Sequence, residues 1–203
     1  MRVGIFGGTF APIHNGHVNA AHNFIKECHL DKLYVIPAGK PPHKTPSDQF
    51  TPQQRLEMTK AAFPKDDEAN SKIEISDFEI NRQEKSYTYY TLKEFSNESD
   101  SLFLLCGTDM FMSFDEWYKF EELFKMCTLC LVLRNDSDLK QIQNIYSKKE
   151  EFENKYKANI LILKSDPYEI SSTEIRNMIS EGKDISKFVP RGVCEYIKNA
   201  YGK

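Results

Sequence analysis

The chain has 203 residues, of which 40% are hydrophobic and 28% are charged, and its formal net charge at pH 7 is −3. This length supports one substantial core, and the slightly acidic balance gives no general reason to expect nucleic acid or an acidic membrane as a partner. No apolar run approaches the ~20 residues that span a bilayer, and the first apolar run begins at Val3. We therefore expect a cytoplasmic protein with one domain, residues 1–203, and a helical C-terminal subregion at about 171–203.

Apolar runs alternate with segments of helical periodicity along the chain. Four of the runs are continuously apolar, which is typical of a parallel sheet covered on both faces. Strands that alternate with helices form right-handed βαβ units. We predict an α/β fold, a Rossmann-like doubly wound parallel sheet with a small helical C-terminal part, whose strands cover Val3–Phe6, Lys32–Ile36, Ile73–Ile80, Leu102–Cys106, Thr128–Leu133 and Ile160–Leu163.

Three further segments carry local signals. Thr51 to Gln54 has the pattern of a capping box with proline at the first helical position. Residues 140–157, rich in lysine and glutamate, predict a helix with a solvated face. Cys127 and Cys130 have CxxC spacing, but their apolar run favours buried strand residues over redox or zinc chemistry.

Unusual residues gather where predicted strands end, and ligands of doubly wound sheets bind at that edge. Gly7 and Gly8 follow the first strand, although their surroundings fit neither the GxGxxG fingerprint nor a P-loop. Adjacent glycines let backbone N–H groups approach a phosphate closely. Pro12 then predicts a turn, and a helix opens near Gly16, where its N-terminus favours anions.

His14 and His17 stand at this helix start, and three interpretations compete for them. Zinc ligation lacks the expected partners, because no HExxH motif or Cys/His pairing accompanies them, so we predict no metal site made of protein side chains. A pair of solvent-facing polar residues is the second interpretation. The third is a pair of hydrogen-bond donors to a phosphoryl group during its transfer, a reaction that needs positioning and charge stabilisation.

A second cluster of donors is expected for a leaving pyrophosphate. Either Ser171 or Ser172 can cap a helix whose free N–H groups face outward. Arg176 lies on the first turns of that helix, and arginine suits bidentate contact with phosphate.

Taken together, these motifs resemble the nucleotidyltransferase superfamily with its (H/T)xGH and ISSTxxR patterns. Five further blocks occur in the order typical of the bacterial nicotinate-nucleotide adenylyltransferase family: Pro41–Lys44, Arg55–Met58, Ser86–Thr88, Gly107–Met110 and Trp117–Lys119. The similarity covers nearly the whole chain. It implies a magnesium-dependent transfer of AMP from ATP to nicotinate mononucleotide in NAD biosynthesis, which gives deamido-NAD and pyrophosphate.

The resemblance also implies roles for particular residues. His14, His17 and Arg176 are the expected catalytic residues. The expected ATP-binding residues are Gly8, Thr9, Phe10, Gly107, Arg134, Ile170, Ser172 and Thr173. Trp117 is expected to stack on the pyridine ring, with a core or interface aromatic as its alternative. The other expected substrate-binding residues are Lys44, Thr88, Asp109 and Tyr118. Thr88 and backbone amides around Trp117 and Tyr118 are expected to recognise the nicotinate carboxylate.

This chain departs from the family pattern at Ala11, over Arg82–Lys85 and at Tyr90. The last two changes lie in the segment that, by the resemblance, helps to recognise the nicotinate group of the mononucleotide. An enzyme that uses nicotinamide mononucleotide, or both mononucleotides, therefore stays as an alternative, as does a nucleotide-binding regulator without turnover. Phosphopantetheine adenylyltransferases are typically shorter and lack several of these blocks. The sequence leaves the oligomeric state open.

Overall fold

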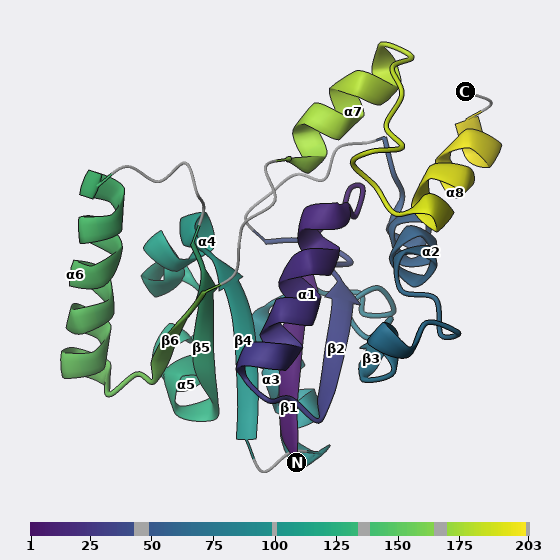
Figure 1. Ribbon diagram of the computed structural model, residues 1–203. Helices are drawn as coiled ribbons and strands as arrows, with labels where there is room; N and C mark the ends of the chain where they lie inside the picture. The colour runs from purple at the N-terminus through teal and green to yellow at the C-terminus, as the bar shows by residue number, and fades with distance from the viewer. Residues whose placement is uncertain (43–48, 99–100, 134–138, 165–169, 202–203) are drawn as a thin grey trace.

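All six predicted strands form one parallel sheet in the computed structural model, which describes residues 1–42, 49–98, 101–133, 139–164 and 170–201. Its strand order is β3-β2-β1-β4-β5-β6 (Figure 1). The strands are β1 (Arg2–Gly8), β2 (Lys32–Pro37), β3 (Ile73–Ile75), β4 (Ser101–Gly107), β5 (Cys127–Val132) and β6 (Ile160–Leu163). This order is that of the doubly wound dinucleotide-binding fold, so the predicted fold class is confirmed.

The third strand is shorter than predicted. β3 covers only Ile73–Ile75, and the prediction that it extends to Ile80 is wrong. The Phe78 N–H donates to Ser76 Oγ at 3.2 Å, and the Ile80 N–H donates to the Asp77 carbonyl at 3.0 Å. Serine and aspartate favour such local hydrogen bonds, which compete with a continued strand.

Helices cover both faces of the sheet and divide its core in two. One apolar cluster includes residues of α1 (Asn15–Glu27), α2 (Pro52–Ala62), α7 (Ser172–Ser180) and α8 (Arg191–Tyr201). The other includes residues of α3 (Thr88–Phe95), α4 (Thr108–Met112), α5 (Phe120–Met126) and α6 (Leu139–Tyr156). Short 3₁₀ turns, η1 (Glu68–Asn70), η2 (Ser96–Glu98) and η3 (Phe114–Glu116), complete the described elements.

Several local predictions are confirmed. The Thr51 hydroxyl accepts the Gln54 N–H at 3.2 Å and the Gln54 side chain accepts the Thr51 N–H at 2.8 Å, which is the predicted capping box of α2. Ser171 is the N-cap of α7. Cys127 and Cys130 are buried in β5. No helix in the described part of the chain is long and apolar enough to cross a membrane.

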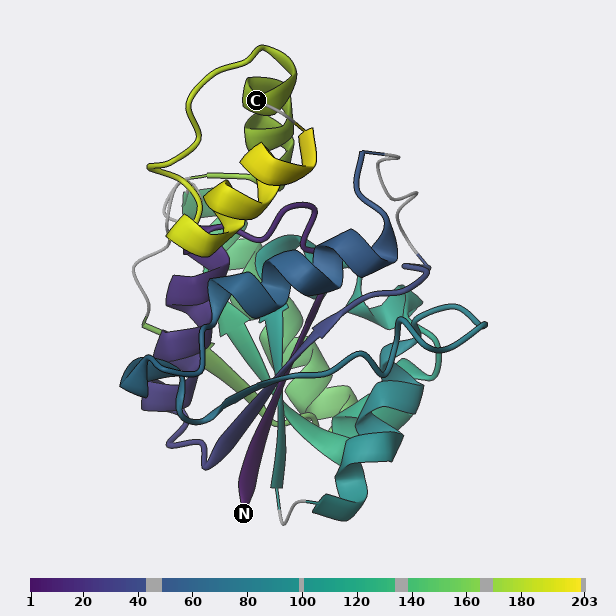
Figure 2. The same cartoon turned by 90° about the vertical axis from the view of Figure 1, so that its right-hand side faces the viewer.

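The strand order reverses beside β1, whose neighbours β2 and β4 lead to helices on opposite faces of the sheet. Such a reversal opens a crevice beyond the carboxyl ends of the central strands. Both views show α7 and α8 at this end of the molecule, with the N-terminus at the opposite end (Figures 1 and 2). The fold therefore brings the C-terminal helices to the edge where β1 and β4 end.

Candidate active site

A pocket of about 600 Å³ occupies the crevice at this edge. It is lined by segments from the β1 end, α1, the segment before α3, the β4 end and the start of α7. Every predicted site residue in the described ranges lines it: Gly8, Thr9, Phe10, His14, His17, Thr88, Gly107, Asp109, Trp117, Tyr118, Ile170, Ser172, Thr173 and Arg176. Lys44 and Arg134 lie outside the described residues.

Two glycines leave the floor of the pocket open. Gly7 precedes Gly8, the last residue of β1, and Gly107 is the last residue of β4. A Cβ atom added at Gly7 or Gly107 would meet no atom of the described chain within 4 Å. Both positions line the pocket, so a side chain there would project into space that a bound molecule can use.

The two histidines lie against each other at the start of α1, with ring centroids 3.7 Å apart. The backbone N–H of His14 donates to Nδ1 of His17 at 3.3 Å. This bond requires a lone pair on Nδ1, so the proton of the neutral His17 imidazole is on Nε2. The arrangement makes Nε2 of His17 a hydrogen-bond donor.

His14 is buried, with 7% of its surface exposed, and its Nδ1 has no hydrogen-bond partner among the described residues. Burial lowers the pKa of His14 from 6.5 to about 4, against an opposing effect of the Glu174 carboxylate. His14 is therefore neutral near pH 7, which avoids repulsion between two cationic rings in contact. A neutral imidazole still donates one hydrogen bond, so both rings suit the predicted donor role.

Phe10 supports His17 from the side. Its backbone lies in the left-handed region with φ of 49°, which is uncommon for a residue with a side chain. The Phe10 ring packs edge-on against His17 at 5.1 Å and against Phe6 at 5.2 Å. Only 2% of Phe10 is exposed, so the side chain of this predicted ATP-binding residue packs mainly within the protein.

The start of α7 is joined to the loop after β1. Ser172 Oγ donates to the Pro12 carbonyl at 2.9 Å, and Nη1 of Arg176 donates to the Ala11 carbonyl at 2.8 Å. Nη2 of Arg176 donates to Thr173 Oγ1 at 3.0 Å. The bonds to Pro12 and Ala11 connect residues 160 and 165 positions apart and place both predicted donor clusters in one pocket.

The other end of the pocket is aromatic. Trp117 stacks on Phe114, with centroids 4.8 Å apart, while Tyr118 packs against Tyr87 at 4.8 Å. Trp117 is half-buried against the core and also lines the pocket, so it packs as a core aromatic while its stacking on a pyridine ring stays a prediction. Its backbone N–H donates to the Phe114 carbonyl at 3.1 Å. That amide is therefore already used, although it was one of those expected to meet the substrate carboxylate.

Behind this end lies a buried polar network whose residues were not among the predicted site residues. Glu79 accepts a hydrogen bond from Thr91 Oγ1 at 2.6 Å and another from Ser86, whose Oγ also accepts the Gly39 N–H at 3.0 Å. Burial raises the pKa of the Glu79 carboxyl. Glu79, Ser86 and Thr91 all line the pocket. The sequence offered one indication of this network, which was the presence of Glu79 inside the predicted strand at residues 73–80.

Arg55 connects this network to the predicted phosphate loop. It is fully buried, and it donates to the Thr9 carbonyl at 2.7 Å and to the Gly39 carbonyl at 3.3 Å. A buried guanidinium with two backbone acceptors fixes the relative position of the loops after β1 and β2. In the sequence, the indication of its importance was that Arg55 begins one of the blocks that resemble the adenylyltransferase family.

A doubly wound sheet that places helix N-termini, imidazoles and a guanidinium around one crevice defines a protein that binds phosphate-containing nucleotides. The chain belongs to the cytidylyltransferase-like family, whose model matches residues 5–178. Within that family it groups with the nicotinate-nucleotide adenylyltransferases, which confirms the resemblance read from its motifs.

Two relatives and one solved structure document the similarity. A protein of Clostridium kluyveri named "Probable nicotinate-nucleotide adenylyltransferase" is 36% identical, over 98% of this chain and 97% of its own. One of the same name from Clostridium botulinum strain Eklund 17B is 38% identical over 97% and 95% of the two chains. The nicotinic acid mononucleotide adenylyltransferase of Plasmodium falciparum, solved in complex with NaAD, matches with a TM-score of 0.74 at 18% identity, over 98% of this chain and 95% of its own. At this identity the structural match supports the fold alone.

Proposed function

We propose that this protein transfers the adenylyl group of ATP to nicotinate mononucleotide and gives deamido-NAD and pyrophosphate. The observation that carries the proposal is the single pocket in which the loop after β1, the two histidines and the start of α7 meet an aromatic end. Family membership sets the reaction class, and the acceptor follows from the names of the relatives. We also propose that residues 1–203 act as one nucleotidyltransferase domain. A cytoplasmic location stays a prediction.

In this reaction a phosphate oxygen of the mononucleotide attacks the α-phosphorus of ATP, and the bond from that phosphorus to the bridging oxygen of the β-phosphate breaks. The attacking phosphate is already ionised near pH 7, so it needs no general base. The Nε2–H of His17 and a neutral His14 donate hydrogen bonds to the charge that develops on the transferred group. Ser172, Thr173 and Arg176 hold the triphosphate at the start of α7.

Recognition of the acceptor is assigned to the aromatic end. Trp117 is proposed to stack on the pyridine ring, and Asp109 to bind ribose hydroxyls. Thr88 lies at the start of α3, where a helix N-terminus favours the nicotinate carboxylate. Tyr118 completes this end. A neutral amide lacks the negative charge of the acid, so preference for the acid follows from electrostatics as well as from shape.

Magnesium is the expected cofactor of the proposed reaction. The described residues contain no group of three or more His, Cys, Asp or Glu side chains that could hold a metal ion. The donors at the pocket fit phosphate oxygens, so they suit Mg²⁺ that is carried by the triphosphate and keeps several waters. Bound in this way, the ion would neutralise charge on the pyrophosphate. The residues named above orient the phosphates.

The first test is pyrophosphate release from ATP and Mg²⁺ with nicotinate mononucleotide or its amide in separate reactions. Release with the acid alone is expected. Comparable release with both supports the dual-specificity alternative and contradicts the roles of Thr88 and of the backbone amide of Tyr118 in acid recognition. Binding of ATP without pyrophosphate release under any condition contradicts the enzymatic proposal and favours a regulator.

The His17→Ala variant tests the assigned mechanism. Loss of a donor to the transferred group is expected to lower kcat by roughly 100-fold or more, with the fold retained. His22→Ala is the matched control, because His22 lies on the same helix but bonds to Asn70 at 2.9 Å and does not line the pocket. Near-normal kcat in His17→Ala, or an equal loss in both variants, contradicts the role of His17.

A further inference from the structure

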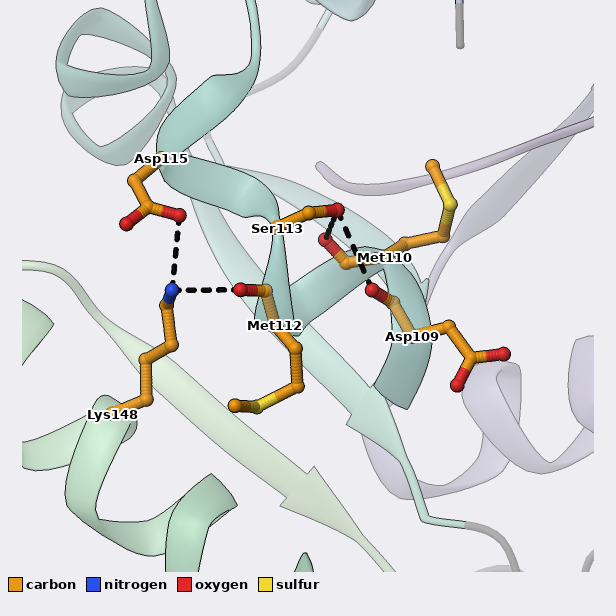
Figure 3. A network of polar contacts seen from close by, with 6 residues as sticks. All are labelled: Asp109, Met110, Met112, Ser113, Asp115 and Lys148. Atoms are coloured by element: carbon orange, nitrogen blue, oxygen red, sulfur yellow. Dashed lines mark hydrogen bonds and ion pairs between the residues drawn. The ribbon is translucent and has the colours of Figure 1, made fainter. Parts of the chain in front are cut away.

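One lysine outside the pocket contacts the chain segment that forms its aromatic end. Lys148 lies on α6, and no residue of α6 lines the pocket. Its Nζ donates to the Met112 carbonyl at 2.7 Å and pairs with Oδ1 of Asp115 at 2.9 Å (Figure 3). The exposed fraction is 16% for the Lys148 side chain and 44% for the Asp115 side chain, so the ion pair is shielded from solvent on the lysine side.

The two acceptors lie on either side of a bend in the chain. Met112 is the last residue of α4, where a carbonyl has no partner within its own helix, and Asp115 lies in η3. Between them, Ser113 Oγ lies 3.4 Å from the Asp109 carbonyl and 3.5 Å from the Met110 carbonyl. Lys148 therefore joins the end of α4 to η3 and fixes the angle between them.

This bend separates two residues of the proposed acceptor site. Asp109 lies near the start of α4, with its carboxylate directed away from Lys148 (Figure 3), and Trp117 directly follows η3. The Trp117 N–H bonds to the Phe114 carbonyl at 3.1 Å and its ring stacks on Phe114. A change at the bend is thus transmitted through Phe114 to the indole ring.

We propose that Lys148 is a positioning residue for the acceptor nucleotide, acting through the bend between α4 and η3 on Asp109 and Trp117. The inference rests on the proposed function for the identity of the acceptor. It predicts a selective effect, because the donors assigned to the triphosphate lie on α7 and not on α4 or η3. A displacement of about 1 Å at a binding group is enough to weaken recognition severalfold.

The adjacent residue provides a matched control. Lys149 carries the same charge on the same helix, but it pairs with Glu153 within α6. Lys149→Met therefore removes a lysine ion pair without touching α4 or η3. Lys148→Arg keeps a cation that can reach the same two acceptors, and Asp115→Asn removes the ion pair while the Met112 carbonyl keeps its donor.

Steady-state kinetics with both substrates is the main experiment. Lys148→Met is expected to raise KM for nicotinate mononucleotide about tenfold, as loss of a charge-assisted hydrogen bond allows, while KM for ATP changes less than about twofold. Lys148→Arg is expected to recover most of the affinity, and Asp115→Asn to show a smaller rise. Lys149→Met is expected to match the wild type.

A second readout does not depend on turnover. Trp117 is the only tryptophan in the chain, so intrinsic tryptophan fluorescence reports on this ring alone. Lys148→Met is expected to increase acrylamide quenching of Trp117 in the protein without substrates, whereas Lys149→Met leaves it unchanged. Equal quenching in Lys148→Met and the wild type overturns the proposal.

Two kinetic results also overturn it: an unchanged KM for the mononucleotide in Lys148→Met, and an equal rise in both KM values. An effect of the same size in Lys149→Met counts against it as well. If the wild type shows no turnover with nicotinate mononucleotide, the proposed function fails. In that case the fluorescence comparison still decides whether Lys148 positions Trp117.

Discussion

At the scale of the residue, the two histidines of one motif occupy different environments. His17 is half-buried and its tautomer is set by the backbone N–H of His14. His14 is buried and its imidazole is neutral over most of the physiological range, because burial lowers its pKa to about 4. A single sequence pattern thus yields two donors that do not repel each other.

The burial of His14 makes the stability of the protein depend on pH. The unfolded chain binds a proton at His14 below pH 6.5, whereas the folded protein does so only near pH 4. The free energy of unfolding is therefore expected to fall as the pH drops through this window. Between pH 7 and pH 5 the contribution of His14 to this loss is about 2 kcal/mol.

Urea unfolding of the wild type and of His14→Gln at these two pH values measures that contribution. The variant has no imidazole to protonate at this position, so its stability is expected to decline less, by about 2 kcal/mol. Equal pH dependence in the two proteins contradicts the burial of a neutral His14.

At the scale of the element, helix starts carry much of the proposed chemistry. α7 begins with a capping box in which Ser171 Oγ accepts the Glu174 N–H at 3.2 Å and Glu174 accepts the Ser171 N–H at 2.8 Å. The same motif opens α2 with Thr51 and Gln54, away from the pocket. The two caps have the same local geometry, but only the cap of α7 is placed at the pocket.

Replacing each cap by alanine separates stability from function. Ser171→Ala and Thr51→Ala are both expected to lower the free energy of unfolding by about 1 kcal/mol. Only Ser171→Ala is expected to raise KM for ATP, since fraying of α7 displaces Ser172 and Arg176. Thermal unfolding and initial rates check this, and a rise in KM for ATP in Thr51→Ala would show that the kinetic effect follows from lost stability.

At the scale of the whole molecule, the network around Arg55 connects elements that are remote in sequence. Arg55 on α2 joins the loops after β1 and β2, and Glu79 joins Ser86 to Thr91 of α3. The positive charge of Arg55 lowers the pKa of Glu79 and opposes the effect of burial. The two buried groups therefore stabilise each other's charged form.

Arg55→Met is expected to lower the free energy of unfolding by about 3 kcal/mol, because the buried carbonyls of Thr9 and Gly39 lose their donor. It also removes one of the two cations that lower the pKa of Glu79 and leaves only Arg82. In the variant the pKa of the buried Glu79 carboxyl is expected to rise further, because one positive charge is gone. The free energy of unfolding of the variant then falls as the pH rises through this pKa, since the buried carboxyl has to lose its proton. The destabilisation is thus expected to be larger at pH 8 than at pH 5.

The double variant Arg55→Met/Glu79→Gln tests the coupling between the two groups. It is expected to recover about 1 kcal/mol of the free energy of unfolding at pH 8, because no carboxylate is left at position 79. Strict additivity of the two changes in a double-mutant cycle contradicts the coupling.

The sequence by itself determined the features that depend on local chemistry. The six apolar runs predicted the strands of the parallel sheet, and the serine and threonine patterns at Ser171 and Thr51 predicted the helix starts. The motif histidines and the glycines pointed to the edge of the sheet where the pocket lies. These signals lie within a few residues of each other, where hydrogen bonding and side-chain periodicity restrict the backbone directly.

Only the tertiary structure decided which distant residues share a site. It placed Arg176 on the Ala11 carbonyl, buried Arg55 behind the pocket and brought Lys148 to the end of α4. None of these contacts follows from a local pattern, because the partners lie 165, 46 and 36 positions apart in the chain and meet only when the fold forms. The physical reason is that a buried polar group takes its partner from whatever the fold places beside it, often more than a hundred residues away.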